Sequence, residues 1–229
     1  MGQFQSILVA GLTGFFSGFA LSIPAGPVNL TIINEGAQRG FSWAVLIGLG
    51  ATVMEVIYCF IAFTGFAGLV QTHYIKEGMQ LFTFVFFLFL GVKFLMAKSV
   101  EIPVSLGAKA HRIEERVQQK FNPHSAFMIG FVRVLGNLGV LVVWIALAAS
   151  FIAHGWVQPD WAGKLACLGG VTFGVGLFYF ALSFAASRGH GKLSEKTLLR
   201  MEHGSGIGLL ALALFYGIQI IIQMARLKS

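Results

Sequence analysis

Two prolines interrupt an apolar stretch near the start of the chain. Pro24 and Pro27 flank Gly26 in the sequence Ser-Ile-Pro-Ala-Gly-Pro-Val-Asn, which begins at Ser22 and ends at Asn29. A helix breaks at this motif because proline has no N–H and its ring clashes with the carbonyl four residues earlier. Backbone groups freed in hydrocarbon need partners, so the break must face protein or a water-filled cavity.

The half-helix that begins at Pro27 is the first candidate binding site. The first turn of a helix carries unpaired N–H groups and the positive end of the helix dipole, which together favour a carboxylate. We therefore expect a neutral anion-binding notch at membrane depth, formed by Ser22, Pro24, Gly26, Pro27 and Asn29. The alternative is that the prolines only kink a helix for packing.

Glu55 is the second candidate, because it is the one acidic residue expected well inside a span. An ionised carboxylate there costs at least about 2.5 kcal/mol on insertion scales, so it must be protonated, paired or hydrated. Such a group is suited to carrying a proton or to holding the ammonium of an amino acid. Arg133, in a later span, is the predicted partner of Glu55 in proton coupling, and the alternative is a purely structural ion pair.

The surrounding residues are typical of a helical membrane protein. Of the 229 residues, 56% are apolar and 11% are charged, against about 25% charged in an average soluble domain. The apolar residues come in blocks of twenty or more, the length of a membrane-spanning helix. We expect an all-α integral membrane protein with six spans at about 7–33, 41–70, 78–97, 125–152, 162–186 and 204–225.

The basic residues lie mainly in the connections between these spans. Eleven of the sixteen Lys and Arg residues fall on one side of the membrane: Arg39, six between residues 93 and 120, and four between residues 188 and 200. The positive-inside bias places that side in the cytoplasm and both termini outside. The net charge of +7 then reflects topology and anionic lipid rather than nucleic acid.

The six spans form two sets of three that resemble each other. Glycine pairs thirteen residues apart recur in the third and sixth spans, and the second and fifth spans align with Tyr58 opposite Tyr179. A repeated unit of three spans enters the membrane in opposite senses, which is the inverted-repeat architecture of secondary transporters. The counterpart of the proline break then falls at Asn137, between Gly136 and Gly139, as a milder break because no proline is present.

The chain is predicted to form a single membrane domain, which the duplication divides into two repeats. Repeat one covers about 7–97 and repeat two about 124–226. The connection between them, about 98–123, has apolar and basic stripes typical of an interfacial helix, and a gating or partner-docking role is the alternative. Asn137 joins the predicted substrate-binding residues because it lies at the second break.

The stretch from Ser22 to Tyr58 resembles the LysE/RhtB family of bacterial amino-acid exporters, with its Pro-Ala-Gly-Pro motif and a glycine-rich second span. The likeness covers almost the whole chain and includes a polar lead-in with Ser-Gly before the last helix. Glu55 stands where the family usually has Asp, and Asn137-Leu138-Gly139 where it often has Asn-Pro-Lys. The resemblance implies export of an amino acid or a relative from the cytoplasm across the bacterial inner membrane, driven by proton or cation exchange.

Other function classes fit the residues less well. ATP is not expected to drive transport, because no nucleotide-binding motif is present, and we expect no cofactor and no enzymatic activity. A metal or other cation exporter needs several intramembrane acids or histidines. A thiol-redox protein would need paired cysteines, whereas Cys59 and Cys167 are better interpreted as buried apolar residues. The protein is also a possible homo-oligomer.

Overall fold

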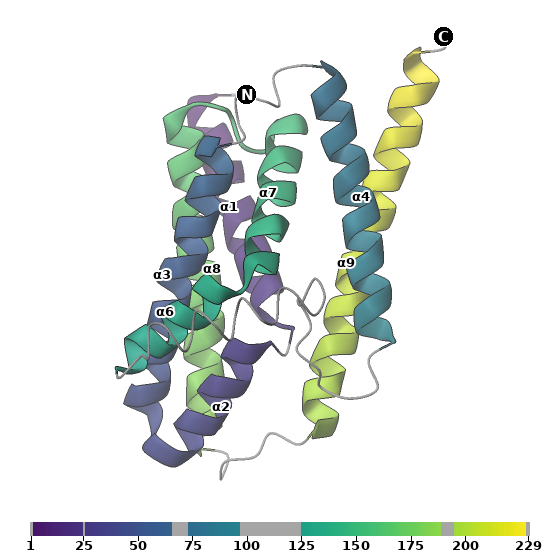
Figure 1. Ribbon diagram of the computed structural model, residues 1–229. Coiled ribbons are helices and arrows are strands. Elements are labelled where there is room, and N and C mark those ends of the chain that lie inside the picture. Colours follow the sequence, from purple (N-terminus) through teal and green to yellow (C-terminus); the bar gives the residue numbers. More distant parts are fainter. Residues whose placement is uncertain (1, 25, 66–72, 97–124, 189–194, 228–229) are drawn as a thin grey trace.

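The computed structural model describes residues 2–24, 26–65, 73–96, 125–188 and 195–227, and their regular secondary structure is helical throughout (Figure 1). The helices, in chain order, are α1 (Gln3–Ser22), α2 (Pro27–Arg39), α3 (Phe41–Gly65), α4 (His73–Leu95), α6 (Ala126–Gly136), α7 (Leu138–Ala153), α8 (Trp161–Arg188) and α9 (Glu195–Leu227). The predicted interfacial helix at about 98–123 lies outside the described residues.

Four of the described helices are long and apolar enough to cross a membrane, namely α1, α3, α8 and the part of α9 from Leu199–Ile222. The bent pair α6 and α7 counts as a fifth if it forms one span, and the apolar part of α4, Leu81–Leu95, is shorter. Large apolar side chains such as Phe173 and Ile221 are exposed, 74% and 67% respectively, as lipid contact requires. The chain is therefore an all-helical, multi-pass membrane protein, while the count of six spans stays a prediction.

Both helix breaks occur where the sequence predicts them. α1 ends at Ser22 and α2 begins at Pro27, and Asn137 alone separates α6 from α7. α1 by itself is a candidate span of 20 residues, so the first break follows a full apolar helix instead of dividing the expected span 7–33. The bend of 68° between α6 and α7 is a full interruption of the helix, although the segment has no proline.

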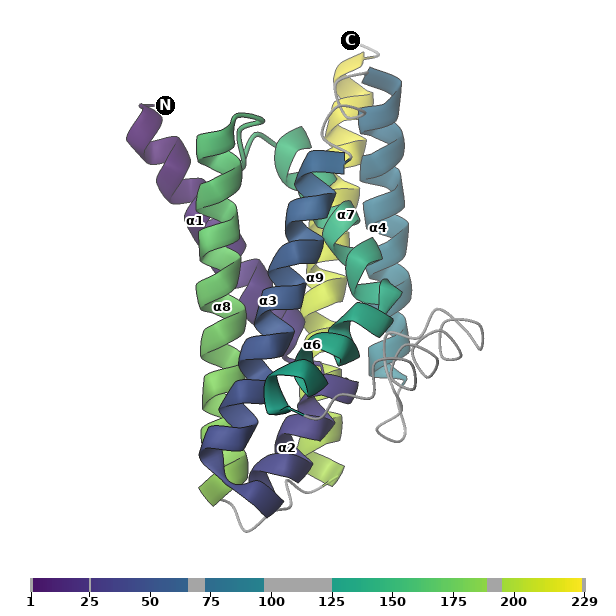
Figure 2. The ribbon, with the colours of Figure 1, turned by 60° about the vertical axis from the view of Figure 1, so that its left-hand side comes forward.

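The helices form a bundle in which α4 and α9 run side by side as a pair, beside a group made by the other helices (Figures 1 and 2). Within the group, α1 packs along α8, and the short α6 lies across α3. The start of α1 and the end of α9 lie at the same end of the bundle (Figure 1).

Glycines bring the packed helices into backbone contact. Gly14, Gly18 and Ser22 form a buried stripe on α1, and a Cβ at Gly14 would strike the backbone of Cys167 in α8. Small residues of this kind allow close helix approach in membranes, where dispersion contacts replace the hydrophobic effect. Gly26, four residues after Ser22, has no neighbour closer than 3.9 Å to its would-be Cβ, so it is not a packing position.

The α1–α8 and α3–α6 interfaces share one register. Gly14 of α1 approaches the backbone of Cys167 in α8, just as Gly130 of α6 approaches that of Ile47 in α3. One turn away, Gly170 of α8 approaches Gly11 of α1, just as Gly50 of α3 approaches Phe127 of α6. In this register Gly170 of α8 corresponds to Gly50 of α3. Tyr58 then corresponds to Phe178, one residue away from the alignment that the sequence suggests.

Cys59 and Cys167 are both buried and free. They lie on α3 and α8, two helices that pack against each other in the interior of the bundle. The prediction that they are apolar packing residues is confirmed.

A matched pair of glycine substitutions tests the backbone contact between α3 and α6. Gly130→Ala should lower the thermal unfolding midpoint in detergent, because its methyl group would strike the backbone of Ile47 and overpacking costs about 1–3 kcal/mol. Gly169→Ala, whose Cβ meets nothing within 4 Å, should leave the midpoint unchanged or raise it slightly, since Ala favours the helix. Equal midpoints for the two variants would contradict the close approach.

Candidate functional site

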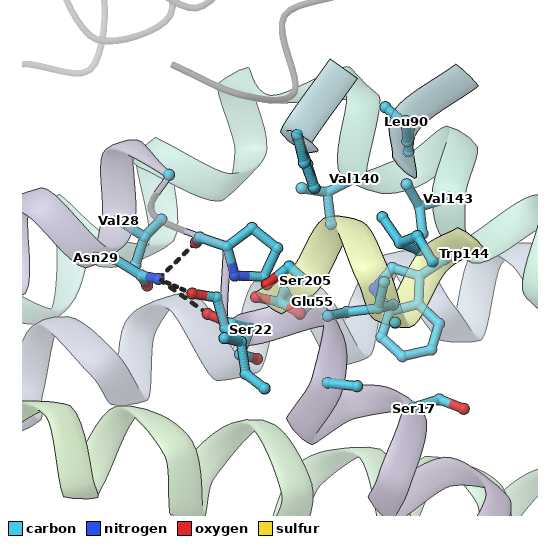
Figure 3. Close-up of a pocket in the computed structure, with 18 of the residues that line it drawn as sticks. Ser17, Ser22, Val28, Asn29, Glu55, Leu90, Val140, Val143, Trp144 and Ser205 are labelled. Atoms are coloured by element: carbon cyan, nitrogen blue, oxygen red, sulfur yellow. Dashed lines mark hydrogen bonds between the residues drawn. The ribbon is translucent and has the colours of Figure 1, made fainter. Parts of the chain in front are cut away.

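A cavity of about 390 Å³ lies inside the bundle, where the two broken helices meet (Figure 3). Its volume is within the usual range of small-molecule sites. All seven predicted substrate-binding residues line it, namely Ser22, Pro24, Gly26, Pro27, Asn29, Glu55 and Asn137. The first break therefore opens onto a cavity and is not sealed by side chains.

Asn29 satisfies the carbonyl side of the first break. Its Nδ2 donates to the carbonyl of Ser22 at 2.9 Å and to that of Pro24 at 2.6 Å (Figure 3). Neither carbonyl accepts a hydrogen bond within the ladder of α1, and a bare carbonyl at this depth would be costly. The Pro24 carbonyl also accepts from the N–H of Gly26 at 2.7 Å. Asn29 is only 2% exposed. Its side-chain nitrogen is already engaged as a donor, so the side-chain oxygen is the atom left to accept a hydrogen bond.

The N–H side of the same break has no such partner. Gly26 at the N-cap has no side chain, and Pro27 at the first helical position has no N–H to donate. The hydrogen-bond ladder of α2 starts with the N–H of Leu30, which donates to the carbonyl of Gly26 at 3.1 Å. Within the described part of the chain, no acceptor meets the N–H groups of Val28 and Asn29, and both residues line the cavity. An uncapped, positive helix end therefore borders the cavity.

Glu55 lines the cavity from α3 and is 5% exposed. Its Oε1 lies 2.8 Å from the hydroxyl of Tyr179 on α8, which donates to it. A Cβ at Gly48 would lie 2.8 Å from the Cβ of Tyr179, so glycine at this position makes room for the tyrosine. This hydrogen bond links α3 to α8 at the wall of the cavity that the end of α1 also lines.

The second break has a similar arrangement. Asn137 caps the end of α6 through its N–H, which donates to Val134 at 2.9 Å, and the carbonyl of Leu135 accepts from the hydroxyl of Tyr58 at 2.7 Å. Among the described residues, the Asn137 side-chain amide has no hydrogen-bond partner. Because Asn137 and Val140 line the cavity, the first turn of α7 is a second helix N-terminus at its wall.

Arg133 does not join this site. It lies on α6, is partly buried, and forms no ion pair with Glu55, nor does it line the cavity. The predicted Glu55–Arg133 pair is therefore absent between these two described residues, and Tyr179 is the partner of Glu55 instead.

Three residues were missed by sequence reasoning. Tyr179 and Ser205 line the cavity, and the available signal for Tyr179 was a hydroxyl deep in an apolar span, which needs a partner. Glu202 is 1% exposed within the candidate span Leu199–Ile222. Glu202 falls outside the predicted sixth span because α9 begins earlier than that span, and it lies three residues after the start of the candidate span.

The architecture is that of a multi-pass membrane transporter, in which interrupted helices meet at an internal cavity with a buried acid at its wall. The LysE type translocator family model matches residues 19–220, and the chain belongs to this family of translocators. It is also 26% identical over 224 residues to a Bacillus subtilis (strain 168) protein described as "Putative amino acid efflux protein YcgF", covering 98% of this chain and 99% of that protein. No solved structure matches the chain significantly.

The role of Asn29 at the first break is open to a direct test. Asn29→Leu should lower the thermal unfolding midpoint in detergent, because the buried Ser22 carbonyl loses its donor and an unsatisfied buried group costs about 1–3 kcal/mol. The Pro24 carbonyl keeps the N–H of Gly26 at 2.7 Å. Thr31→Val is the matched control on the same helix, since the Thr31 hydroxyl only bonds the carbonyl of Pro27 four residues back. A loss of stability in the control equal to that of Asn29→Leu would contradict the assigned role.

Proposed function

We propose that this protein is a secondary active exporter of an amino acid or amino-acid derivative, coupled to a proton or cation gradient. The observation that carries the proposal is a cavity that presents an uncapped helix N-terminus and one buried carboxyl together. The positive helix end complements the carboxylate that every amino acid carries, and the ionised carboxyl complements its ammonium group. Membership of the LysE type translocator family and the efflux activity named for the relative support it.

The substrate carboxylate binds at the first turn of α2. The N–H groups of Val28 and Asn29, which have no acceptor among the described residues, lie there. The positive end of the helix dipole lies at the same place. This is how half-helices in transporters hold anionic groups without a charged side chain. The side-chain amide of Asn137, which has no partner in the described part of the chain, supplies a further donor on the cavity wall at the second break.

Glu55 binds the ammonium group or the coupled proton. When ionised, it accepts a hydrogen bond from Tyr179, as the observed 2.8 Å distance allows. When protonated, it can donate to the Tyr179 oxygen instead, so the contact between the two side chains persists in both states. Tyr179 therefore positions Glu55 through either half of the cycle. Proton coupling through Arg133 stays a prediction, with no contact between Arg133 and Glu55.

A metal-cation exporter is the second transport class to weigh. Hard and borderline cations need several carboxylate, imidazole or thiolate ligands. Glu55 is the one charged side chain among the described residues that line the cavity. The lining therefore favours a zwitterion over a metal ion.

Alternating access is the proposed mechanism, with two inverted repeats rocking around the cavity. The shared register of the α1–α8 and α3–α6 contacts supports such a repeat, as does the pairing of α4 with α9. In this arrangement both termini lie outside the cytoplasmic membrane, on the same end of the bundle (Figure 1), with the eleven basic residues inside.

Neutralising Glu55 tests the coupling role. In proteoliposomes, Glu55→Gln should abolish efflux driven by a pH gradient, because an amide neither exchanges a proton nor attracts an ammonium group. Glu35→Gln is the matched control, since Glu35 pairs with Arg39 at 3.0 Å and lies outside the cavity lining. Wild-type efflux by Glu55→Gln across the same gradient would remove Glu55 from the mechanism.

The proline motif is tested by replacing both Pro24 and Pro27 with alanine. The double variant should still insert in the membrane, but substrate binding should weaken by about tenfold or more, because a continuous helix buries the free N–H groups in its own ladder. Equilibrium binding of labelled amino acids to the purified protein in detergent measures this effect. Binding at the wild-type level would contradict the binding role and indicate that the prolines only kink the helix for packing.

A further inference from the structure

The cavity has two chemically different ends. Ser22 and Asn29 lie at one end in Figure 3, beside the helix break, while Leu90, Val143 and Trp144 lie at the other. Glu55 lies between them in this view. A ligand that fills the whole cavity therefore has a polar head and an apolar body.

The apolar end is built by three helices that make no part of the first break. Leu90 comes from α4, Val143 and Trp144 from α7, and Leu209 from α9, and each of these side chains is at least 94% buried. Their hydrocarbon atoms offer dispersion contacts, which suit an aliphatic or aromatic group. The indole N–H of Trp144, which is buried and has no hydrogen-bond partner among the described residues, is the hydrogen-bond donor that these four side chains add.

The charge on the lining limits the side chain further. Glu55 is the one charged residue among the described residues of the wall, and the proposed function already assigns it to the ammonium group or the coupled proton. A lysine or glutamate side chain would then enter the apolar end with no counter-charge, at a large desolvation cost.

Glycine on α9 leaves room for a bulky group at this end. Ser205, Gly208, Leu209 and Leu212 recur at helical spacing and all line the cavity. Gly208 lies in the middle of that stripe, and a Cβ built there meets nothing within 4 Å. Without this glycine, a side chain of α9 would occupy the space.

We infer that the substrate is an amino acid with a large, uncharged, apolar side chain, which packs between α4, α7 and α9. The inference rests on the proposed function, since it places the amino and carboxyl groups at the first break. It adds the class of side chain, which the wall of the apolar end selects by shape and by the absence of charge.

Counterflow in proteoliposomes of the full-length protein tests the inference with a panel of labelled amino acids. Leucine and phenylalanine should exchange about tenfold or more faster than alanine, lysine and glutamate, the discrimination that an apolar pocket provides for missing methylene groups. Faster exchange of lysine or glutamate would overturn this inference and leave the exporter intact. Exchange of no amino acid on the panel would overturn the proposed function itself.

Filling the apolar end gives a second, independent readout. Gly208→Leu should slow phenylalanine exchange about tenfold and change alanine exchange by less than about twofold, because only the large side chain needs the space. Gly176→Leu on α8 is the matched control, since its Cβ also meets nothing within 4 Å but the residue does not line the cavity. An equal loss for both substrates would contradict the assigned pocket.

Enlarging the same end keeps the inference falsifiable if Gly208→Leu does not fold. Val143→Ala removes two methyl groups from a wall residue that is 6% exposed. It should raise tryptophan exchange relative to leucine. An unchanged ratio of the two rates, in a variant that elutes as a single species, would contradict the inference.

Discussion

The structure depends on one constraint, that a helix broken inside lipid must find partners for the main-chain groups it frees. At the first break the carbonyls of Ser22 and Pro24 accept hydrogen bonds from Asn29, while the first N–H groups of α2 have no acceptor in the described structure. The two ends of one break are thus treated unequally. The carbonyl end accepts hydrogen bonds from the protein, whereas the amide end faces the cavity, which gives the cavity a positive side without a basic residue among the described residues of its wall.

Backbone-to-backbone packing holds this arrangement in place. Glycines let α1 lie against α8 and α6 lie against α3 so closely that even a methyl group has no space. Because α3 and α8 also contact each other, Glu55 and Tyr179 meet within hydrogen-bond distance beside the end of α1. The position of the buried carboxyl therefore follows from glycines that lie at other depths of the same helices and take no part in binding.

Much of this site was predictable, because its key residues act through local chemistry. Two prolines break a helix in any context, and a lone acid in an apolar span needs water or a partner, so Pro24, Pro27 and Glu55 were identifiable from residue type alone. The identity of the partner was not, since it depends on how the helices are rotated against each other. Tyr179 contacts Glu55 and Arg133 does not, and a shift of one residue between α3 and α8 also separates the observed register from the sequence alignment. The apolar end of the cavity could not be predicted either, because its walls come from helices that are distant in sequence.

The single acid suggests how substrate and proton movements are coupled in the proposed exporter. A zwitterion carries no net charge, so its carboxylate is balanced by the end of α2 and its ammonium by ionised Glu55. In the empty cavity a proton neutralises Glu55 in place of the ammonium group. The hydrogen bond between Glu55 and Tyr179 then persists with its direction reversed. Because one carboxyl cannot hold a proton and balance an ammonium group at the same time, the two occupy the site in turn. Mutual exclusion at one site is the requirement for antiport, and it needs no second titratable group in the cavity.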